Sequence, residues 1–289
     1  MLQSAFVKFR LLERRNLLVS LRFTGLPILL TIIAAAASVI GQDAPATPTP
    51  TPPAPIAAAG NSGQTYTAEQ VAESSIFIYG LGGGRIILDQ IRKTTFERGS
   101  IVLTNADGRN QNAQYQRWVI RGENSSTDKV RVEQEFPDAR YSLIHNTDKI
   151  FGVYNDSIFT PRDDAKKAFE NQTFRGLDAL LRYKENESTL ELHGREKIMG
   201  VDFYVVEVTD KQGRKTKFFI SVKSLRVMIL EYEDGGIKYT RRFYDYRNAQ
   251  GTLVPYRTVL WADGKQVEET NVGTITFGQR VDESLFPAG

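Results

Sequence analysis

The residues that could do chemistry are few and widely spaced. The chain has two histidines, His145 and His193, and no cysteine. A mononuclear metal site needs such ligands close together, often with carboxylates at short spacing. The two histidines stand 48 positions apart, inside segments that we predict to be strands. We therefore predict strand-surface or core histidines and no metal site. The absence of cysteine excludes a disulfide, a thiolate nucleophile and a cysteine-ligated metal.

Signatures of common catalytic and cofactor sites are also missing. There is no G-x-S-x-G elbow and no H-E-x-x-H helix. A glycine cluster at 80–84 does not fit a dinucleotide site, because Arg85 occupies the last glycine position and a predicted helix precedes it. Asp163 and Asp164 are adjacent at a predicted helix start, where they complement the helix dipole. We predict no catalytic residue, no cofactor, and a protein that is not an enzyme.

The elements that would position any site are mostly strands. From Val201 onward, runs rich in β-branched and aromatic residues alternate with turns such as Asp234-Gly235-Gly236 and Asp263-Gly264. This pattern is typical of an antiparallel meander. The predicted strands of this part are 201–208, 217–222, 226–233, 238–247, 253–262 and 266–277.

Helices interrupt the strands at two places. Thr67 and Gln70 form a capping box before a helix, and a further helical turn is expected over 85–93. A second helical insertion is predicted to begin with Thr160 as N-cap and Pro161 at the first helical position, followed by a short helix over 177–183. The other predicted strands are 94–105, 114–122, 129–136, 140–146 and 149–156, with 189–200 leading into the meander.

This order predicts one α+β domain over 65–289. A sheet of about twelve strands must curl or close to hide its apolar face. The helices are too few to cover both faces, so we expect them to plug the concave side of an incomplete barrel.

The N-terminal part has a different composition. Residues 1–25 are basic, and residues 26–41 form an uncharged stretch that is short for a membrane span. We predict a signal peptide over 1–41, cleaved before Gln42; the alternative is an uncleaved N-terminal anchor. A linker over 42–64 holds six of the eleven prolines. Without residues 1–42, 32 basic and 33 acidic residues remain, which argues against nucleic-acid binding.

The C-terminal part carries a family resemblance. It combines Phe-Tyr-Asp-Tyr-Arg at 243–247, Gly251, Val-Pro at 254–255 and Val-Asp-Glu-Ser-Leu-Phe-Pro at 281–287. This pattern, over roughly 201–287, resembles the periplasmic outer-membrane lipoprotein-sorting proteins, the LolA-like family in its broad sense. The resemblance implies an unclosed β-barrel of about eleven strands with helices lidding a hydrophobic cavity for acyl chains. Pro255 fits a sheet edge or bulge. Arg117 and Arg121 are candidates for the family's cavity arginine, whereas the linker and the insertion at 157–185 depart from a minimal carrier.

The resemblance implies a periplasmic lipid or lipoprotein carrier for outer-membrane lipoprotein sorting, with acyl chains and membrane-bound partner proteins as its partners. The alternative is an envelope sensor or a protein- or glycan-binding module on the same fold, without lipid transport. A cavity of several hundred Å³ between sheet and helices would favour the carrier. Alternating strand positions predict these ligand-binding residues: Tyr204, Val206, Val208, Phe218, Ile220, Met228, Leu230, Tyr256 and Trp261.

Overall fold

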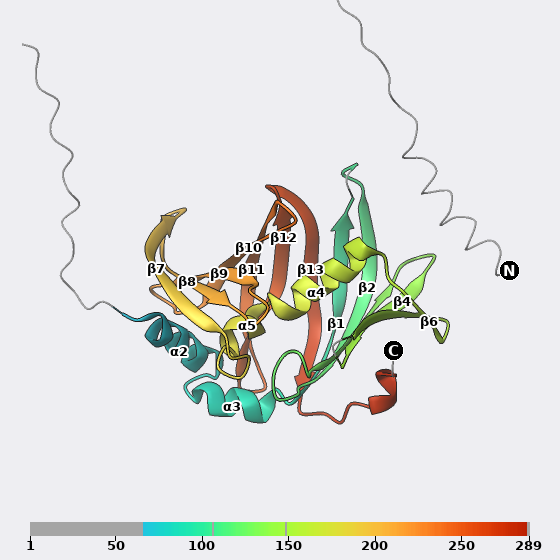
Figure 1. Cartoon of the computed structure of the whole chain (residues 1–289), viewed down its shortest axis with the longest axis horizontal. Coiled ribbons are helices and arrows are strands. Elements are labelled where there is room, and N and C mark those ends of the chain that lie inside the picture. The colour runs from blue at the N-terminus through green and yellow to red at the C-terminus, as the bar shows by residue number, and fades with distance from the viewer. Residues whose placement is uncertain (1–65, 106, 148, 288–289) are drawn as a thin grey trace, which may run out of the picture. The chain divides into compact units, whose positions relative to one another are not determined.

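The computed structural model describes residues 66–105, 107–147 and 149–287 (Figure 1). All of them belong to the compact unit Ser62–Gly289. The signal peptide predicted over 1–41 and the linker predicted over 42–64 lie outside the described residues.

The described residues form an α+β fold built on one antiparallel sheet of thirteen strands, in the order β6-β5-β4-β3-β2-β1-β13-β12-β11-β10-β9-β8-β7. Two meanders make up the sheet, and β1 joins them by pairing with β13. The strands of the first meander are β1 (Thr94–Thr104), β2 (Asn110–Ile120), β3 (Lys129–Glu135), β4 (Arg140–Asn146), β5 (Lys149–Tyr154) and β6 (Ser157–Phe159). Those of the second are β7 (Thr189–Ile198), β8 (Val201–Thr209), β9 (Lys215–Ser221), β10 (Val227–Asp234), β11 (Ile237–Ala249), β12 (Thr252–Ala262) and β13 (Lys265–Phe277).

The sheet does not close, because β6 and β7 stand at opposite ends of the strand order. The predicted half-barrel is thereby confirmed, with two strands more than the expected eleven. The short strand β6 was not predicted. It follows a two-residue turn in which Asn155 and Asp156 have φ values of 47° and 61°, the conformation that such hairpin turns require.

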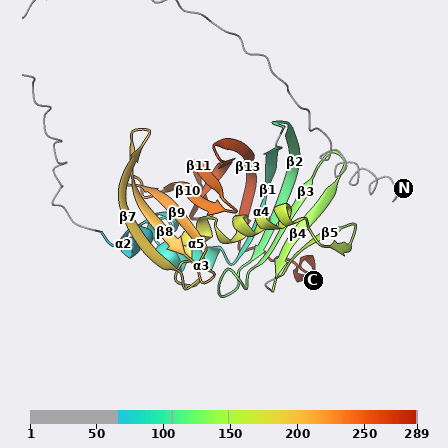
Figure 2. The same ribbon diagram turned by 45° about the horizontal axis from the view of Figure 1, so that its top comes forward.

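Within the described residues, five helical segments accompany the sheet: α2 (Ala68–Tyr79), α3 (Gly84–Ile91), α4 (Asp163–Phe174), α5 (Leu177–Leu181) and the 3₁₀ turn η1 (Glu283–Leu285). Figures 1 and 2 show α4 and α5 against the same side of the curved sheet. The capping box of Thr67 and Gln70 is present at the start of α2. No single helix in the described ranges is long and apolar enough to cross a membrane, although α2 and α3, bent by 50° at their break, pass that test of length and composition as a pair.

The predicted start of α4 is wrong. The helix begins at Asp163 with Arg162 as N-cap, not at Pro161 with Thr160 as N-cap. Pro161 is buried, and the chain stays extended through Arg162, which has a φ of −61° and a ψ of 149°. Asp163 and Asp164 therefore occupy the first turn, where their charges complement the helix dipole as predicted.

The main core lies between helices and the second meander. It joins the buried faces of α2 and α5 to the inward side chains of β8, β9 and β10. We call this side of the sheet the concave face. The largest fully buried side chains of the main core are those of Tyr79, Phe218, Ile76, Leu180, Ile220 and Leu230. A separate cluster of Phe203, Val205, Phe219 and Ile229 covers the other face of the same strands.

Candidate functional site

The structure gathers six of the nine predicted ligand-binding residues on the concave face. They are Tyr204, Val206, Val208, Phe218, Ile220 and Leu230, and they all belong to the main core. β8 and β9 contribute alternate positions, as expected for a pleated sheet with one face against helices. Whether these side chains bind a ligand depends on whether the helices above them can move.

The other three predicted residues lie elsewhere. Met228 packs against the cluster on the opposite face, because the pairing of β10 with β9 shifts between Val227 and Ile229. This irregularity leaves Val227 and Leu230, three positions apart, on the same face. Tyr256 packs with a small cluster around Phe277, and Trp261 lies under the guanidinium of Arg242 at 5.1 Å.

The concave face beneath α2 and α5 is filled. Phe218 and Ile220 from β9, Ile76 from α2 and Leu180 from α5 are each fully buried. These side chains occupy the space that the carrier interpretation assigns to an acyl chain. An acyl chain would therefore have to displace a helix from this face.

Ion pairs hold α5 to the first meander. Arg182, which caps α5, donates from Nη1 to Oδ2 of Asp128 over 2.6 Å, and its Nη2 donates to the carbonyl oxygen of Gly122 over 2.9 Å. The other oxygen of Asp128 accepts the backbone N–H of Gly122 over 2.8 Å. Burial raises the pKa of Asp128, and the charge of Arg182 opposes that rise. We call this group, Gly122, Asp128 and Arg182, the α5 latch.

A second pair lies beside the latch. Arg121 donates from one nitrogen to both carboxylate oxygens of Asp178 over 2.8 Å. Arg121 was one of the two candidates for a family arginine; the other, Arg117, contributes to the field at Asp178. Burial alone would raise the pKa of Asp178, but the charges of Arg121, Arg92 and Arg182 outweigh it and hold that pKa well below its ordinary value.

The lowered pKa of Asp178 predicts a pH dependence of stability. An aspartate in an unfolded chain has a pKa of about 3.9. Asp178 therefore contributes its full stabilisation above that pH and loses it as the pH falls toward its lower folded pKa, because the unfolded state then binds more protons. Urea unfolding from pH 7 to pH 2.5 should show a smaller acid-induced loss of stability in Asp178→Asn than in the parent. Equal pH profiles would contradict the assignment.

Polar contacts also hold α2 against neighbouring elements. Arg85 bonds to Glu73 at 3.0 Å and to Glu185 at 2.8 Å, which links α2, α3 and the segment after α5. At the end of α2, the hydroxyls of Tyr79 and Tyr246 are 2.9 Å apart, and Tyr246 donates to the carbonyl oxygen of Val227. Burial raises the pKa of Tyr79 to about 12, so this contact stays uncharged at neutral pH.

A groove of about 480 Å³ opens beside α4, where the two meanders approach each other. We call it the α4 groove. Its lining comes from α4, from the β4–β5 hairpin, from the turn between β8 and β9, and from the segment before β3. Apolar and cationic side chains both contribute, with one carboxylate among them. The lining residues are Ser126, His145, Lys149, Ile150, Phe151, Lys166, Glu170, Phe174, Gln212 and Arg214.

Sequence reasoning missed the latch and the groove. Asp128 and Arg182 are 54 positions apart, and no local pattern marks either of them. Within the groove, the guanidinium of Arg214 lies over the ring of Phe174 at 4.1 Å and bonds to Glu170 at 3.1 Å. These contacts depend on how the insertion docks against the β8–β9 turn.

Comparison with known proteins supports a fold relationship. No family model matches the sequence, and no curated protein matches it. Among solved structures, a DUF1329 family protein from Desulfovibrio piger aligns with a TM-score of 0.56 at 12% identity, over 77% of this chain and 98% of that one. A putative outer membrane lipoprotein-sorting protein domain from Vibrio parahaemolyticus aligns with a TM-score of 0.53 at 16% identity, over 74% and 96%.

A LolA superfamily protein from Nitrosomonas europaea aligns with a TM-score of 0.53 at 12% identity, over 78% of this chain and 99% of that one. The resemblance first drawn from the C-terminal residues thus agrees with the arrangement of the whole sheet. The chain has the fold of LolA superfamily and lipoprotein-sorting domains, an unclosed antiparallel half-barrel with helices against its concave face.

Proposed function

We propose that the protein is a carrier of the bacterial envelope that shields the acyl chain of a lipid or lipoprotein against its concave face. In this proposal it is exported, released by signal-peptide cleavage and active in outer-membrane lipoprotein sorting. The observation that carries the proposal is the α4 groove, which opens on the helix-covered side of a half-barrel shared with lipoprotein-sorting domains.

The physical need for such a carrier is large. Each CH₂ buried is worth about 0.8 kcal/mol, so a sixteen-carbon chain in water carries a cost of roughly 12 kcal/mol. The apolar concave face can offset this cost when α5 moves away. Ion pairs such as Arg182–Asp128 and Arg121–Asp178 hold α5 at defined points. In this proposal α5 has two discrete arrangements, latched and released, as a lid requires.

The lining of the α4 groove suits the polar end of an acylated ligand. Lys149, Lys166 and Arg214 bring three cations to the groove. Arg214 is paired with Glu170 at 3.1 Å and with Asp210 at 2.5 Å. Ile150 and Phe174 stand beside them. An anionic headgroup would bind at Lys166 while the first methylenes of its chain contact the apolar side chains.

One observation favours the alternative of a binding module without lipid transport. The concave face beneath α2 is filled, with Phe218 and Ile220 fully buried. A binding module of this kind would bind a partner protein at a sheet edge, because an edge strand offers unpaired backbone groups to an extended segment of that partner. At the edge strand β6, Ile158 and Phe159 are exposed.

Binding of a fluorescent fatty acid tests the carrier proposal at the groove. We expect saturable binding to the parent protein, and we expect Ser126→Trp to weaken it at least about tenfold, which corresponds to about 1.4 kcal/mol. The indole would occupy the groove that Ser126 lines. Ser157→Trp, on the exposed strand β6, is the matched control and should bind like the parent.

A charge reversal gives a second readout. Lys166→Glu should weaken binding of the fatty-acid carboxylate more than binding of an uncharged acyl ester, because only the former pairs with the ammonium group. Lys265→Glu, at the exposed first residue of β13, is the control for net charge. Absence of saturable acyl binding by the parent protein would reject the carrier and favour the binding module.

A further inference from the structure

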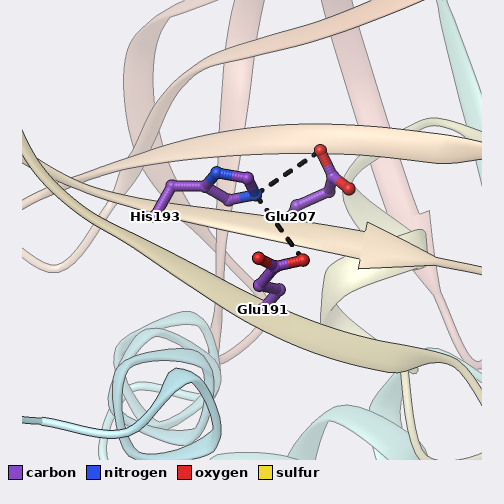
Figure 3. A group of neighbouring side chains, drawn as sticks. All are labelled: Glu191, His193 and Glu207. Atoms are coloured by element: carbon purple, nitrogen blue, oxygen red, sulfur yellow. Dashed lines mark ion pairs between the residues drawn. The ribbon is translucent and has the colours of Figure 1, made fainter.

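The hairpin of β7 and β8 brings His193 together with two carboxylates (Figure 3). Glu191 lies directly opposite Glu207 in the strand register, and His193 follows two positions later on the same side of β7. Nε2 of His193 lies 3.6 Å from one oxygen of Glu207 and 4.0 Å from one oxygen of Glu191. One ligand atom from each residue falls within 4.8 Å of the others.

A bulge in β7 shapes this cluster. The pairing with β8 shifts between Leu192 and Arg195, and Gly194 has a φ of +97°, which glycine adopts readily. Bulges of this kind re-aim a side chain, here that of the residue beside the glycine. His193 consequently lies over β8, close to Glu207, although the regular pairing is interrupted between Leu192 and Arg195.

The cluster lies on the opposite side of the hairpin from the main core. The neighbours of Glu207 in sequence, Val206 and Val208, point into that core, and Leu192 of β7 packs against it. Glu207 must therefore point the other way. A ligand bound at this cluster would not compete with an acyl chain on the concave face.

Glu207 is the fixed member of the cluster. Its side chain is 8% exposed, and its Oε1 accepts an ion pair from Lys215 at 2.9 Å. Its other oxygen, Oε2, faces His193 at 3.6 Å, with Lys217 at 4.0 Å. One carboxylate oxygen is thus held by a lysine while the second remains directed toward the imidazole.

We propose that Glu191, His193 and Glu207 bind a divalent transition-metal cation, for which Zn²⁺ is the probe. One imidazole nitrogen and two carboxylate oxygens are a donor set that Zn²⁺ accepts, at about 2.0–2.2 Å from the metal. Tetrahedral ligands at that distance lie roughly 3.4 Å apart. The 3.6 Å separation of His193 and Glu207 is close to this value, and the 70% exposed Glu191 side chain can rotate to reach it.

The bound cation would fasten the edge of the sheet. β7 pairs only with β8 in the described strand order, so its other side has no strand partner there. Three ligands from the two strands would clip β7 to β8 and leave one coordination position for water. The ammonium of Lys215, which is 65% exposed, can turn into solvent when the metal arrives. The spacing of the histidines in sequence gave no sign of this site, because its carboxylates come from both strands.

Isothermal titration of the full chain with Zn²⁺, after EDTA treatment and dialysis, tests this proposal. We expect one saturable site. His193→Gln and Glu207→Gln should each lower its affinity for Zn²⁺ at least about tenfold, because loss of a residue that only hydrogen-bonds to a metal ligand already lowers metal affinity by about that factor. Glu196→Gln on the same strand is the matched control and should bind like the parent. Lys215→Met should bind Zn²⁺ more tightly, because the competing ammonium is gone.

A second measurement guards against misfolding of a variant. Co²⁺ in place of Zn²⁺ should give visible absorption bands with the parent, and His193→Gln should lose them while keeping the parent's circular dichroism. Absence of saturable binding, or binding that His193→Gln leaves unchanged, would overturn the proposal. The result for Zn²⁺ is independent of acyl binding, because the metal cluster lies on the other face of the sheet.

Discussion

Phe218→Ala is expected to lower the free energy of unfolding by about 3–5 kcal/mol, the usual cost of removing a buried phenylalanine ring. The ring is fully buried in the main core, in the layer between β9 and the helices above it. Its loss removes apolar burial and leaves a cavity that the surrounding strands fill only in part. Urea unfolding followed by circular dichroism gives the measurement.

The neighbouring position is a matched control for function. Phe219 is also buried, but it packs on the opposite face with Phe203 and Ile229. Phe219→Ala should cost a similar amount of stability while leaving acyl binding unchanged. Phe218→Ala should lower stability and also change acyl binding, if the concave face holds the acyl chain. A loss below about 1 kcal/mol for Phe218→Ala would mean that the concave face is not close-packed.

Asp128→Ala is expected to cost about 3–5 kcal/mol, because it leaves a buried guanidinium without its counter-charge. Arg182 and Asp128 have side chains that are 4% and 8% exposed. The change also removes the acceptor for the backbone N–H of Gly122. Chemical denaturation measures the loss, and hydrogen exchange of the amides in α5 should become faster than in the parent.

Two further variants separate the charge from other effects. Asp138→Ala, on an exposed turn between β3 and β4, should change stability by less than about 0.5 kcal/mol. Adding Arg182→Met to Asp128→Ala should recover part of the loss, since no unpaired buried charge remains. A double variant that is less stable than Asp128→Ala alone would contradict the buried-charge explanation.

Asp128→Ala also tests whether α5 acts as a lid over the concave face. If α5 is a lid, weakening the latch should raise the population in which it has left the concave face. If that state binds the acyl chain, apparent affinity should rise in proportion to its population. Stopped-flow binding of the fluorescent fatty acid should then be faster for Asp128→Ala than for the parent. Unchanged binding would assign the latch to stability alone.

The sequence by itself determined most of the secondary structure. The six strands predicted after Val201 correspond to β8 through β13, because their β-branched and aromatic runs are separated by turns, four of which contain glycine. The helix at Ala68 follows from the capping box of Thr67 and Gln70, a contact three residues long. Such features depend on neighbours in the chain, so the sequence is sufficient to predict them.

The face of the sheet on which a side chain lies was predictable only where the strands are regular. Alternation placed Val206 and Val208 correctly on one face of β8. It placed Leu230 correctly but failed for Met228, because the register shift between Val227 and Ile229 turns Met228 to the opposite face. Nothing in the local sequence at Met228 distinguishes the bulge from a regular strand.

The candidate sites were decided by tertiary structure alone. The α5 latch joins residues 54 positions apart, the α4 groove needs both meanders, and His193 meets Glu207 through a cross-strand register and a bulge. Local propensity sets which segments become strands and helices. The contacts between them follow from how a thirteen-stranded sheet curves and where the inserted helices dock, which depends on packing energy summed over distant parts of the chain.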